Sequence, residues 1–381
     1  MTGRPYDVAV VGLGAVGSCA LWQLARRGAR VVGFDREAPP HTLGSTHGRT
    51  RIIREAYFEH PSYVPLVQRA YDLWAELESA TGSVLHRRTG GWMVGPAGGV
   101  LVRGARESAE RHGLPHEVLD APQARSRVPG FAIPDHMVAL TEPRAGILFP
   151  ERCVENALGV ARRLGAEIRT RTRVESIDAQ GGAVSVVTAT GTVIAKRAII
   201  AAGPWLPSLV RDLPLPLHVE RQLAHWFAPA RHAERFDADH APVAIWEFEP
   251  GRLFYTIPDV GHGVKIAVHH EGLIVDPDGP RQPPTPEETE MVRDLLARFL
   301  PDAAGPLLDR TTCLYTNTPD QHFLIDHHPG LPEVLIASPC SGHGFKFASA
   351  VGEAIGEIVL DGRSRRDLSA FTFRERPAVT A

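Results

Sequence analysis

The residues with the clearest chemical meaning are three glycines near the N-terminus, spaced G-x-G-x-x-G. Gly12, Gly14 and Gly17 follow directly on the apolar run at residues 8–11. The first glycine allows a tight turn, the second lets main chain approach a pyrophosphate, and the third permits close packing of helix and strand. Asp35 follows about twenty residues later, where its carboxylate can hydrogen-bond a ribose diol. The spacing predicts a dinucleotide site and leaves open whether the ligand is NAD or FAD.

A strand, a helix and a second strand must position these residues. The apolar run at 8–11 is typical of a buried parallel strand, and residues 15–27 predict a helix. The N-terminus of that helix directs main-chain N–H groups and its dipole toward a phosphate. Gly28 suits the position after the helix, and residues 30–34 predict the next strand, which ends at Asp35.

The segment at residues 38–63 is rich in cations and poor in acids. It contains His41, His47, Arg49, Thr50, Arg51 and Arg54. One interpretation is a solvated surface loop, and the other is a loop that crosses the cofactor and turns its cations toward anionic groups. Arg51 and Arg54 are three residues apart, so one helical turn would place both on one face. Arginine suits planar, bidentate recognition of a carboxylate.

A β-rich region at residues 219–270 contains a lysine within a strand pattern. Alternation of apolar and polar residues at 253–257 and 264–268 predicts antiparallel strands with one face covered. Lys265 lies in the second of these strands, between Val264 and Ile266. The local pattern alone favours a solvent-facing lysine.

A second strand–glycine turn–helix unit stands near the C-terminus. Residues 334–337 predict a buried strand, Gly342 and Gly344 a turn, and residues 345–360 a helix. The N-terminus of that helix also stabilises negative charge, and Lys346 is expected to contact the cofactor there. Two such units at opposite ends of the chain fit a cofactor held at both ends, as an extended FAD would be.

The expected fold class is α/β, with a Rossmann-like FAD-binding domain and an antiparallel-sheet-based (α+β) substrate domain. Strands predicted at 167–174, 184–188 and 195–202 suggest a return to the first domain, with Val174 and Gly203 as cofactor contacts. The FAD-binding domain is expected to comprise residues 1–85, 150–215 and 311–381. The substrate domain is expected to comprise residues 86–149 and 216–310.

The composition is that of a globular protein and excludes several classes of partner. The 41 basic and 44 acidic residues leave no basic surface suited to nucleic acid and no polybasic membrane patch. We expect no secretory signal and no membrane span, because apolar runs of the required length are missing from the sequence. Cys19, Cys153, Cys313 and Cys340 form no CxxC motif, so a reducing cytoplasm is expected. The histidines show no recognised ligand spacing, and no metal is expected.

Five segments together resemble a known family. They are GLGAVG…FD, PPHTLGSTHGRTRIIREAY, VKIAVHH, CLYTNTPDQHFLID and SGHGFKFASAVGE. Their order resembles that of the monomeric sarcosine oxidase and N-methyltryptophan oxidase family, a branch of the D-amino-acid-oxidase-like flavoproteins. The resemblance implies a monomeric FAD enzyme that oxidises the C–N bond of a small secondary amino acid. Electrons would pass through the flavin to O2, giving H2O2, and the imine product would hydrolyse.

The resemblance also implies roles for residues around the flavin. Cys313 resembles the cysteine that is joined covalently to the flavin. Lys265 resembles the lysine over the flavin ring that activates O2, which overrides the solvent-facing interpretation. Thr50 and Arg51 resemble its partners on the same side of the ring, and His47 would lie close to the flavin. A fixed cation there would stabilise the negative charge of reduced flavin and of oxygen as it accepts an electron.

On the substrate side, the resemblance implies a carboxylate clamp and an amine pocket. Arg54 and Lys346 resemble the pair that holds the substrate carboxylate. The residues that resemble the lining of the amine pocket are His269, Tyr255 and Tyr315. The substrate amine should react unprotonated, because its lone pair assists C–H cleavage.

Other functions stay open at this point. Within the enzyme class, the alternative is a flavin oxidase of a cyclic imino acid such as pipecolate, or of a biosynthetic amine intermediate. A dehydrogenase that passes electrons to a carrier is disfavoured by Lys265. A non-catalytic dinucleotide-binding redox sensor is disfavoured by the presence of Lys265, Arg54 and Lys346 together.

Overall fold

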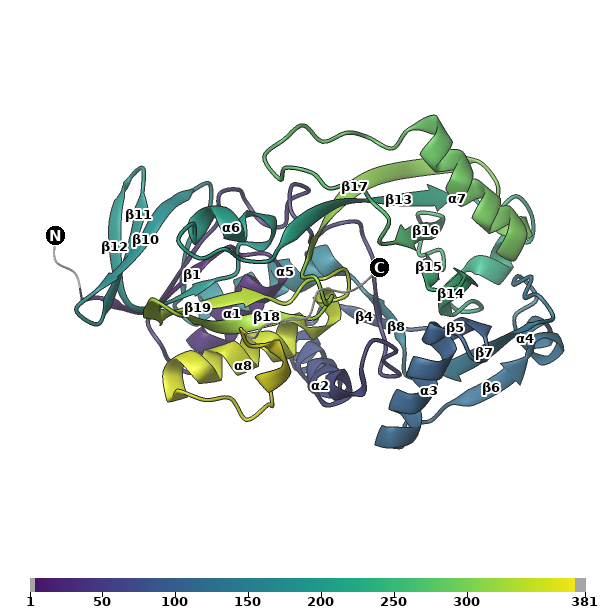
Figure 1. The fold of residues 1–381 in the computed structure, drawn as a ribbon, viewed down its shortest axis with the longest axis horizontal. Helices are drawn as coiled ribbons and strands as arrows, with labels where there is room; N and C mark the ends of the chain where they lie inside the picture. Colours follow the sequence, from purple (N-terminus) through teal and green to yellow (C-terminus); the bar gives the residue numbers. More distant parts are fainter. Residues whose placement is uncertain (1–3, 374–381) are drawn as a thin grey trace.

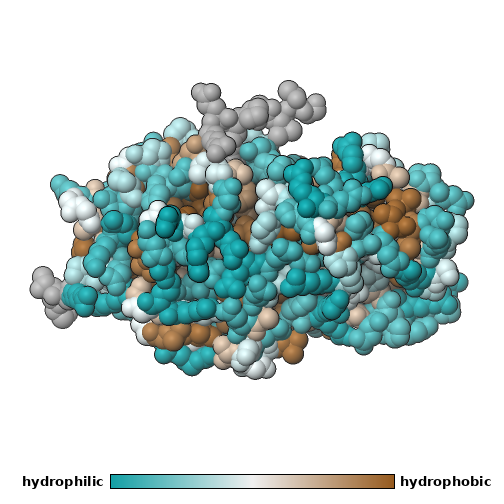
Figure 2. All heavy atoms as spheres, turned by 90° about the horizontal axis from the view of Figure 1, so that it is seen from below, coloured by the Kyte–Doolittle hydropathy of each residue, from teal (hydrophilic) through white to brown (hydrophobic). Residues whose placement is uncertain are grey.

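The computed structural model describes residues 4–373. Two eight-stranded sheets lie toward opposite ends of the long axis, and the long strands β13 and β17 extend between them (Figure 1). The face shown in Figure 2 is mainly hydrophilic, with a few separate apolar areas. Within residues 4–373, none of the helices combines the length and apolarity needed to cross a lipid bilayer.

The first sheet carries the predicted dinucleotide unit. Its parallel strands, in spatial order, are β19 (Leu331–Ser338), β12 (Gly191–Ile200), β1 (Tyr6–Val11), β2 (Val31–Phe34) and β9 (Glu167–Arg169). Antiparallel strands flank them: β18 (Leu324–His328) on β19, and the hairpin β10 (Val174–Gln180) and β11 (Ala183–Thr188) on the start of β12. The single strand expected at 167–174 is therefore two separate strands, β9 and β10.

Apolar residues cover both faces of the first sheet, as a parallel sheet requires. Val8 and Val10 of β1 contact one apolar cluster and Ala9 and Val11 the other, following the two-residue alternation of a strand. Five helices share the first cluster: α1 (Ala15–Arg26), α2 (Val64–Thr81), α3 (Val100–His112), α5 (Pro150–Arg163) and α8 (Ala348–Asp361). The short helix α6 (Leu206–Leu209) packs with the second cluster. The predicted helix at 345–360 begins as a 3-10 turn, η5 (Phe345–Phe347), before α8.

The second sheet is mainly antiparallel. Its strand order is β17 (Leu307–Asn317), β13 (His218–Phe227), β16 (Val264–His269), β15 (Arg252–Ile257), β14 (Val243–Glu249), β5 (Gly91–Pro96), β7 (Met137–Glu142) and β6 (Glu117–Asp120). Only the pair β14–β5 is parallel in this sheet. Helix α7 (Pro286–Phe299) packs on it and begins with a capping box between Thr285 and Glu288. Helices α3 (Val100–His112) and α4 (Ala121–Arg127) complete this end. The predicted fold class is confirmed.

A small third sheet corrects one prediction. It consists of β3 (Arg51–Ile53), β8 (Gly146–Leu148) and β4 (His86–Arg88). Arg51 is thus in a strand, and the helical turn expected to place it on one face with Arg54 is absent. Short 3-10 turns complete the chain: η1 (Pro61–Tyr63), η2 (Gly203–Trp205), η3 (Ala233–Phe236), η4 (Pro301–Ala303) and η6 (Ser369–Phe371).

The division into two discontinuous domains stays a proposal. Along the chain, segments of one proposed domain alternate with segments of the other, and the strands of the two large sheets alternate in a similar way. The proposed boundary at 311 lies inside β17, which spans 307–317 and pairs with β13 over its whole length.

Candidate active site

A cavity of about 520 Å³ is lined by residues from both large sheets. Most of the predicted site residues line it: Gly12, Gly14, Asp35, His47, Arg51, Arg54, Val174, Gly203, Tyr255, Lys265, His269, Cys313, Tyr315, Gly342, Gly344 and Lys346. Gly17 and Thr50 do not line the cavity, but each contacts a residue that does. A Cβ atom on Gly17 would lie 1.7 Å from the main-chain oxygen of Gly12, so Gly17 is what lets α1 approach β1. Thr50 contributes its main-chain oxygen.

The dinucleotide end of the cavity has the geometry that the glycine motif predicts. Gly12 has φ +89°, and a Cβ atom on it would lie 2.5 Å from a main-chain oxygen just after β12. Gly14 precedes α1 and offers no side-chain cap, and the first residues of the helix, Ala15 and Val16, line the cavity. The N–H of Ala15 donates to Thr46 Oγ1 at 3.3 Å. Asp35 accepts a hydrogen bond from the main-chain N–H of Leu13 at 2.8 Å. The acid at the end of β2 is therefore fixed beside the glycine turn.

Buried polar atoms along the cavity fit a large polar ligand. Ser45 Oγ, His47 Nε2 and Thr316 Oγ1 are buried and lack a hydrogen-bond partner within residues 4–373. All three residues line the same cavity. Because buried polar groups in folded proteins are normally paired, these atoms indicate a ligand with its own donors and acceptors, such as a flavin.

Lys265 lies on β16, lines this cavity and is 1% exposed. Its Nζ donates to the main-chain oxygens of Gly48 at 2.8 Å and Thr50 at 2.9 Å. It also lies 5.2 Å from the ring centroid of Trp226. Burial, together with the positive charge of Arg51, holds the pKa of Lys265 well below its ordinary value. The solvent-facing interpretation of this lysine is wrong.

Cys313, on β17, is the more acidic of the two cysteines that line the cavity. Its Sγ lies 3.6 Å from Nη2 of Arg51 and 3.5 Å from the main-chain oxygen of Ser45. Burial disfavours its thiolate, but His47, Arg51 and Lys265 stabilise the charge and lower the pKa of Cys313 to about 7. Burial raises the pKa of the Cys340 thiol to about 11.

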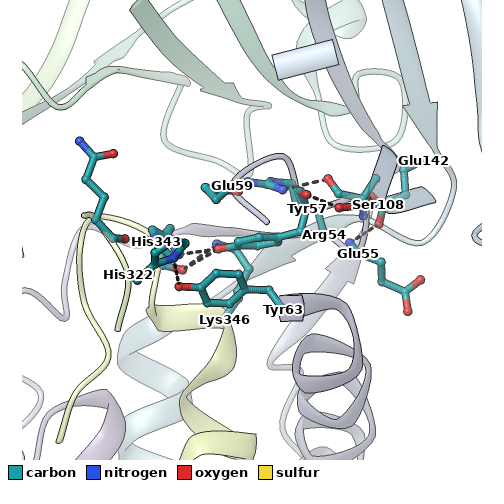
Figure 3. A network of polar contacts seen from close by, with 12 residues as sticks. Arg54, Glu55, Tyr57, Glu59, Tyr63, Ser108, Glu142, His322, His343 and Lys346 are labelled. Carbon is teal, nitrogen blue, oxygen red and sulfur yellow. Dashed lines mark hydrogen bonds and ion pairs between the residues drawn. The ribbon is translucent and has the colours of Figure 1, made fainter. Parts of the chain in front are cut away.

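Arg54 binds a carboxylate from its own loop (Figure 3). It is 3% exposed, and its Nη2 donates to both carboxylate oxygens of Glu59, at 2.9 and 2.7 Å. Nη1 donates to the main-chain oxygen of Ala56 at 2.9 Å. Its Nε is buried and has no hydrogen-bond partner in the described part of the chain. The guanidinium lies over the ring of Tyr57, 4.2 Å from its centroid.

Lys346 lies on the same side of the cavity as Arg54. Its Nζ donates to the main-chain oxygen of His343 at 2.8 Å and to the hydroxyl of Tyr57 at 3.3 Å. The Tyr57 hydroxyl is also 2.6 Å from Nδ1 of His343 (Figure 3). Burial and the nearby charge of Arg54 lower the pKa of Lys346 to about 7. The structure thus brings the two predicted carboxylate-binding residues together.

Imidazole and phenol groups form the remaining wall. His269 Nδ1 lies 3.4 Å from the hydroxyl of Tyr315, and Tyr255 lines the same cavity. Burial, followed by the charge of His270, holds the pKa of His269 well below its ordinary value, so its imidazole is neutral. A Cβ atom on Gly342 would lie 2.6 Å from the ring of Tyr315, so this glycine makes room for the phenol.

Three residues of the Arg54–Lys346 region were not predicted from the sequence: Tyr57, Glu59 and His343. Glu59 is only a few positions after Arg54 in the sequence, so an acid close to this arginine was the signal that could have identified it. Tyr57 and His343 are distant in sequence and meet only because β3 and η5 are neighbours in the fold.

Comparison with known proteins decides the family. Residues 7–358 match the family described as FAD dependent oxidoreductase. The chain belongs to this family. This match confirms FAD as the cofactor and the oxidoreductase class, and together with the relatives described next it confirms the predicted resemblance. The glycines and the unpaired polar atoms of the site suit FAD.

Relatives within the family match almost the whole chain. Monomeric sarcosine oxidase of Streptomyces avermitilis is 38% identical over 380 residues, which covers 99% of each chain. N-methyl-L-tryptophan oxidase of Yersinia pestis is 36% identical over 371 residues, covering 96% of this chain and 98% of the relative.

Solved structures at lower identity share the fold. NikD, an unusual amino acid oxidase essential for nikkomycin biosynthesis, superposes with a TM-score of 0.84 at 22% identity over 97% of this chain and 98% of that one. L-proline dehydrogenase from P. horikoshii superposes with a TM-score of 0.83 at 21% identity, over 97% and 96% of the two chains.

Proposed function

We propose that the protein is an FAD-dependent oxidase of secondary, N-methyl amino acids, with O2 as electron acceptor and H2O2 as product. The observation that carries this proposal is a single cavity with two cationic centres, Arg54 with Lys346 on one side and Lys265 with Arg51 on the other. The names of the relatives, sarcosine oxidase and N-methyl-L-tryptophan oxidase, support the substrate class.

The residues that would hold FAD lie at both ends of the cavity. Gly12, Gly14 and the N-terminus of α1 would receive the pyrophosphate, and Asp35 the ribose. Gly342 and Gly344 would bring main chain close to the opposite end of the cofactor. When bound, FAD supplies the hydride acceptor for C–N oxidation and the route of electrons to O2.

Arg54 and Lys346 would bind the substrate carboxylate. Both carboxylate oxygens of Glu59 accept from Nη2 of Arg54, so this nitrogen already binds an internal anion. Substrate binding is therefore an exchange, in which the incoming carboxylate replaces Glu59. The unpaired Nε of Arg54 offers a further donor to that carboxylate.

Lys265 would serve the oxygen half of the reaction. Its Nζ is held by two main-chain oxygens, which fix the amine in position before O2 arrives and favour its protonated form. A preorganised cation in a water-poor site stabilises charge that develops during electron transfer. Arg51, which donates to the main-chain oxygens of Thr50 and Ser45, would reinforce the same field.

The amine of the substrate would lie against His269, Tyr255 and Tyr315. Neutral His269 does not repel a cationic amine, and a ring nitrogen can accept a hydrogen bond from it. Two phenols and an imidazole also leave room for an N-methyl group while offering hydrogen bonds to nitrogen.

Cys313 would attach the flavin covalently: an S–C bond would replace the thiol S–H bond and one flavin C–H bond, and the two electrons released would pass through the flavin to O2. The thiolate is the form that reacts, and a pKa of about 7 makes it available at neutral pH. Acid precipitation tests this role, because covalent flavin stays in the protein pellet. We expect a yellow pellet for wild type and for Cys340→Ala and a colourless one for Cys313→Ala. A yellow Cys313→Ala pellet places the link elsewhere, and free FAD from wild type rules out attachment.

A peroxide-coupled screen of N-methyl and cyclic amino acids tests the function. We expect sarcosine or another N-methyl amino acid to release H2O2 and to bleach the flavin under nitrogen. Bleaching without peroxide formation in air would indicate a dehydrogenase. Absence of bleaching by every amine tested would overturn the oxidase assignment. Size-exclusion chromatography of the same sample tests the expected monomer.

A further inference from the structure

The loop that carries Arg54 is held by a buried carboxylate outside the cavity. Glu142, the last residue of β7, is 2% exposed and does not line the cavity. Its Oε1 accepts the main-chain N–H of Glu55 at 2.6 Å and its Oε2 that of Ala56 at 2.8 Å (Figure 3). These are the two peptide groups that directly follow Arg54, so one side chain fixes the main chain at the arginine.

Burying this carboxylate away from water costs free energy, so its position requires a structural reason. Burial raises the pKa of Glu142 to about 7, while the two main-chain N–H groups and the charge of Arg54 oppose that rise. An apolar residue would avoid this cost at a position enclosed by protein. The compensation that Glu142 receives comes from the peptide groups of the loop, and its effect is to define where that loop lies.

We infer that Glu142 is a positioning residue, which holds Arg54 in the place where it binds the substrate carboxylate. This inference rests on the role proposed for Arg54. The contact crosses from β7 of the second sheet to the end of β3, so it also joins the amine-binding part of the molecule to the carboxylate-binding loop.

Two further contacts hold the same loop but do not act on these peptide groups. Ser108 Oγ donates to the main-chain oxygen of Tyr57, and the Glu55 carboxylate accepts from Arg144 at 2.7 Å. Glu55 is buried like Glu142, whereas the side chain of Arg144 is 43% exposed. Glu55→Gln is therefore a matched control, since it neutralises a buried acid of the loop and leaves the main-chain contacts of Glu142 in place.

Glu142→Gln removes one acceptor and replaces it with an NH2 group that faces an N–H donor. One of the two peptide groups then loses its partner, so the main chain that follows Arg54 is held by one of these two bonds in place of both. Glu142→Asp keeps the charge but is one methylene shorter, so it should retain part of the effect.

The experiment uses the flavin-containing protein and butyrate, the carbon isostere of sarcosine, which has a carboxylate but no amine. Butyrate binding is followed by the change in flavin absorbance. We expect Glu142→Gln to raise the Kd for butyrate by about tenfold or more, Glu142→Asp to give an intermediate Kd, and Glu55→Gln to stay close to wild type.

Kinetics supply a readout that a general loss of structure would not give. In Glu142→Gln, KM for sarcosine should rise with kcat nearly unchanged, and the slower oxidation of dimethylamine, which lacks a carboxylate, should be unaffected. Equal Kd values for butyrate in Glu142→Gln and Glu55→Gln would overturn the inference. If Glu142→Gln does not fold, a wild-type Kd in Glu142→Asp would overturn it instead.

Arg54→Ala separates this inference from the function on which it rests. If Arg54→Ala weakens butyrate binding and Glu142→Gln does not, Glu142 has no positioning role and the carboxylate site stands. If Arg54→Ala leaves butyrate binding unchanged, the carboxylate site itself is wrong, and the role of Glu142 fails with it.

Discussion

Lys265 and Lys346 are both buried amines in one cavity, yet their surroundings differ in one decisive respect. Each donates to main-chain oxygens, and burial lowers the pKa of each. The hydrogen bonds of Lys265 go to main-chain oxygens alone, beside the ring of Trp226. Lys346 stands beside Arg54, whose guanidinium already holds the carboxylate of Glu59.

The difference separates two uses of a buried cation. A cation that already holds an internal carboxylate can exchange it for an external one, which suits a stable ligand such as an amino acid. A cation that is hydrogen-bonded to neutral dipoles and pairs with no carboxylate suits negative charge that exists only during the reaction. The predictions below test this distinction, beginning with the largest expected effect.

Arg54→Ala should abolish the preference for amino acids over the corresponding decarboxylated amines. Removing one partner from a buried ion pair costs about 3–5 kcal/mol, so kcat/KM for sarcosine should fall by a factor of hundreds or more. Dimethylamine should be oxidised as by wild type. Arg144→Ala is the control, because Arg144 binds the same loop through Glu55 outside the cavity. Unchanged discrimination between the two substrates would contradict the assignment.

Binding of butyrate should weaken as pH rises above neutrality. The pKa of Lys346 is lowered to about 7, so its ammonium is present below that pH and is lost above it. The Kd should rise by up to about tenfold per pH unit above 7, because the bound anion favours the protonated lysine. Butyrate carries no amine, so substrate ionisation does not enter the measurement. Lys346→Met should bind more weakly and should lose the rise in Kd above pH 7, and a rise that survives this change would assign the titration to another group.

Glu59→Gln should strengthen butyrate binding by a few-fold. Burial opposes ionisation of Glu59, but Arg54, His343 and Lys346 outweigh it and lower the pKa of that carboxyl, so an anion competes for Arg54. The amide is nearly isosteric and uncharged, and Arg54 should accept an external carboxylate more readily. Titration by flavin absorbance measures the change. Weaker binding in Glu59→Gln would mean that Glu59 organises Arg54 and does not compete with its ligand.

The sequence predicts the dinucleotide end of this site well because its signals are local. Gly17 is required by a main-chain contact with Gly12 inside one strand–turn–helix unit, and Asp35 binds the N–H of Leu13 from the end of the next strand. The capping box between Thr285 and Glu288 is equally local. Such features depend on a few neighbouring residues, so their spacing carries the information.

Sequence reasoning fails where the decisive partner is distant in the chain. Arg51 is in β3 because β8 pairs with it, and a spacing of three residues gave no sign of that pairing. Lys265 is buried because the loop at Gly48 and Thr50 covers it, although its neighbours in the strand resemble a solvent-facing pattern. Glu142 also gave no signal, since its only recognisable function is to bind peptide groups far away in sequence.

The central claim is that the two lysines act in different halves of the reaction, and stopped-flow kinetics of Lys265→Met and Lys346→Met tests it most directly. In Lys265→Met, anaerobic flavin reduction by sarcosine should stay near wild type while reoxidation by O2 slows by roughly 10²–10³-fold. In Lys346→Met, sarcosine should bind more weakly during reduction while reoxidation stays near wild type. Equal slowing of both half-reactions in Lys265→Met would contradict the account.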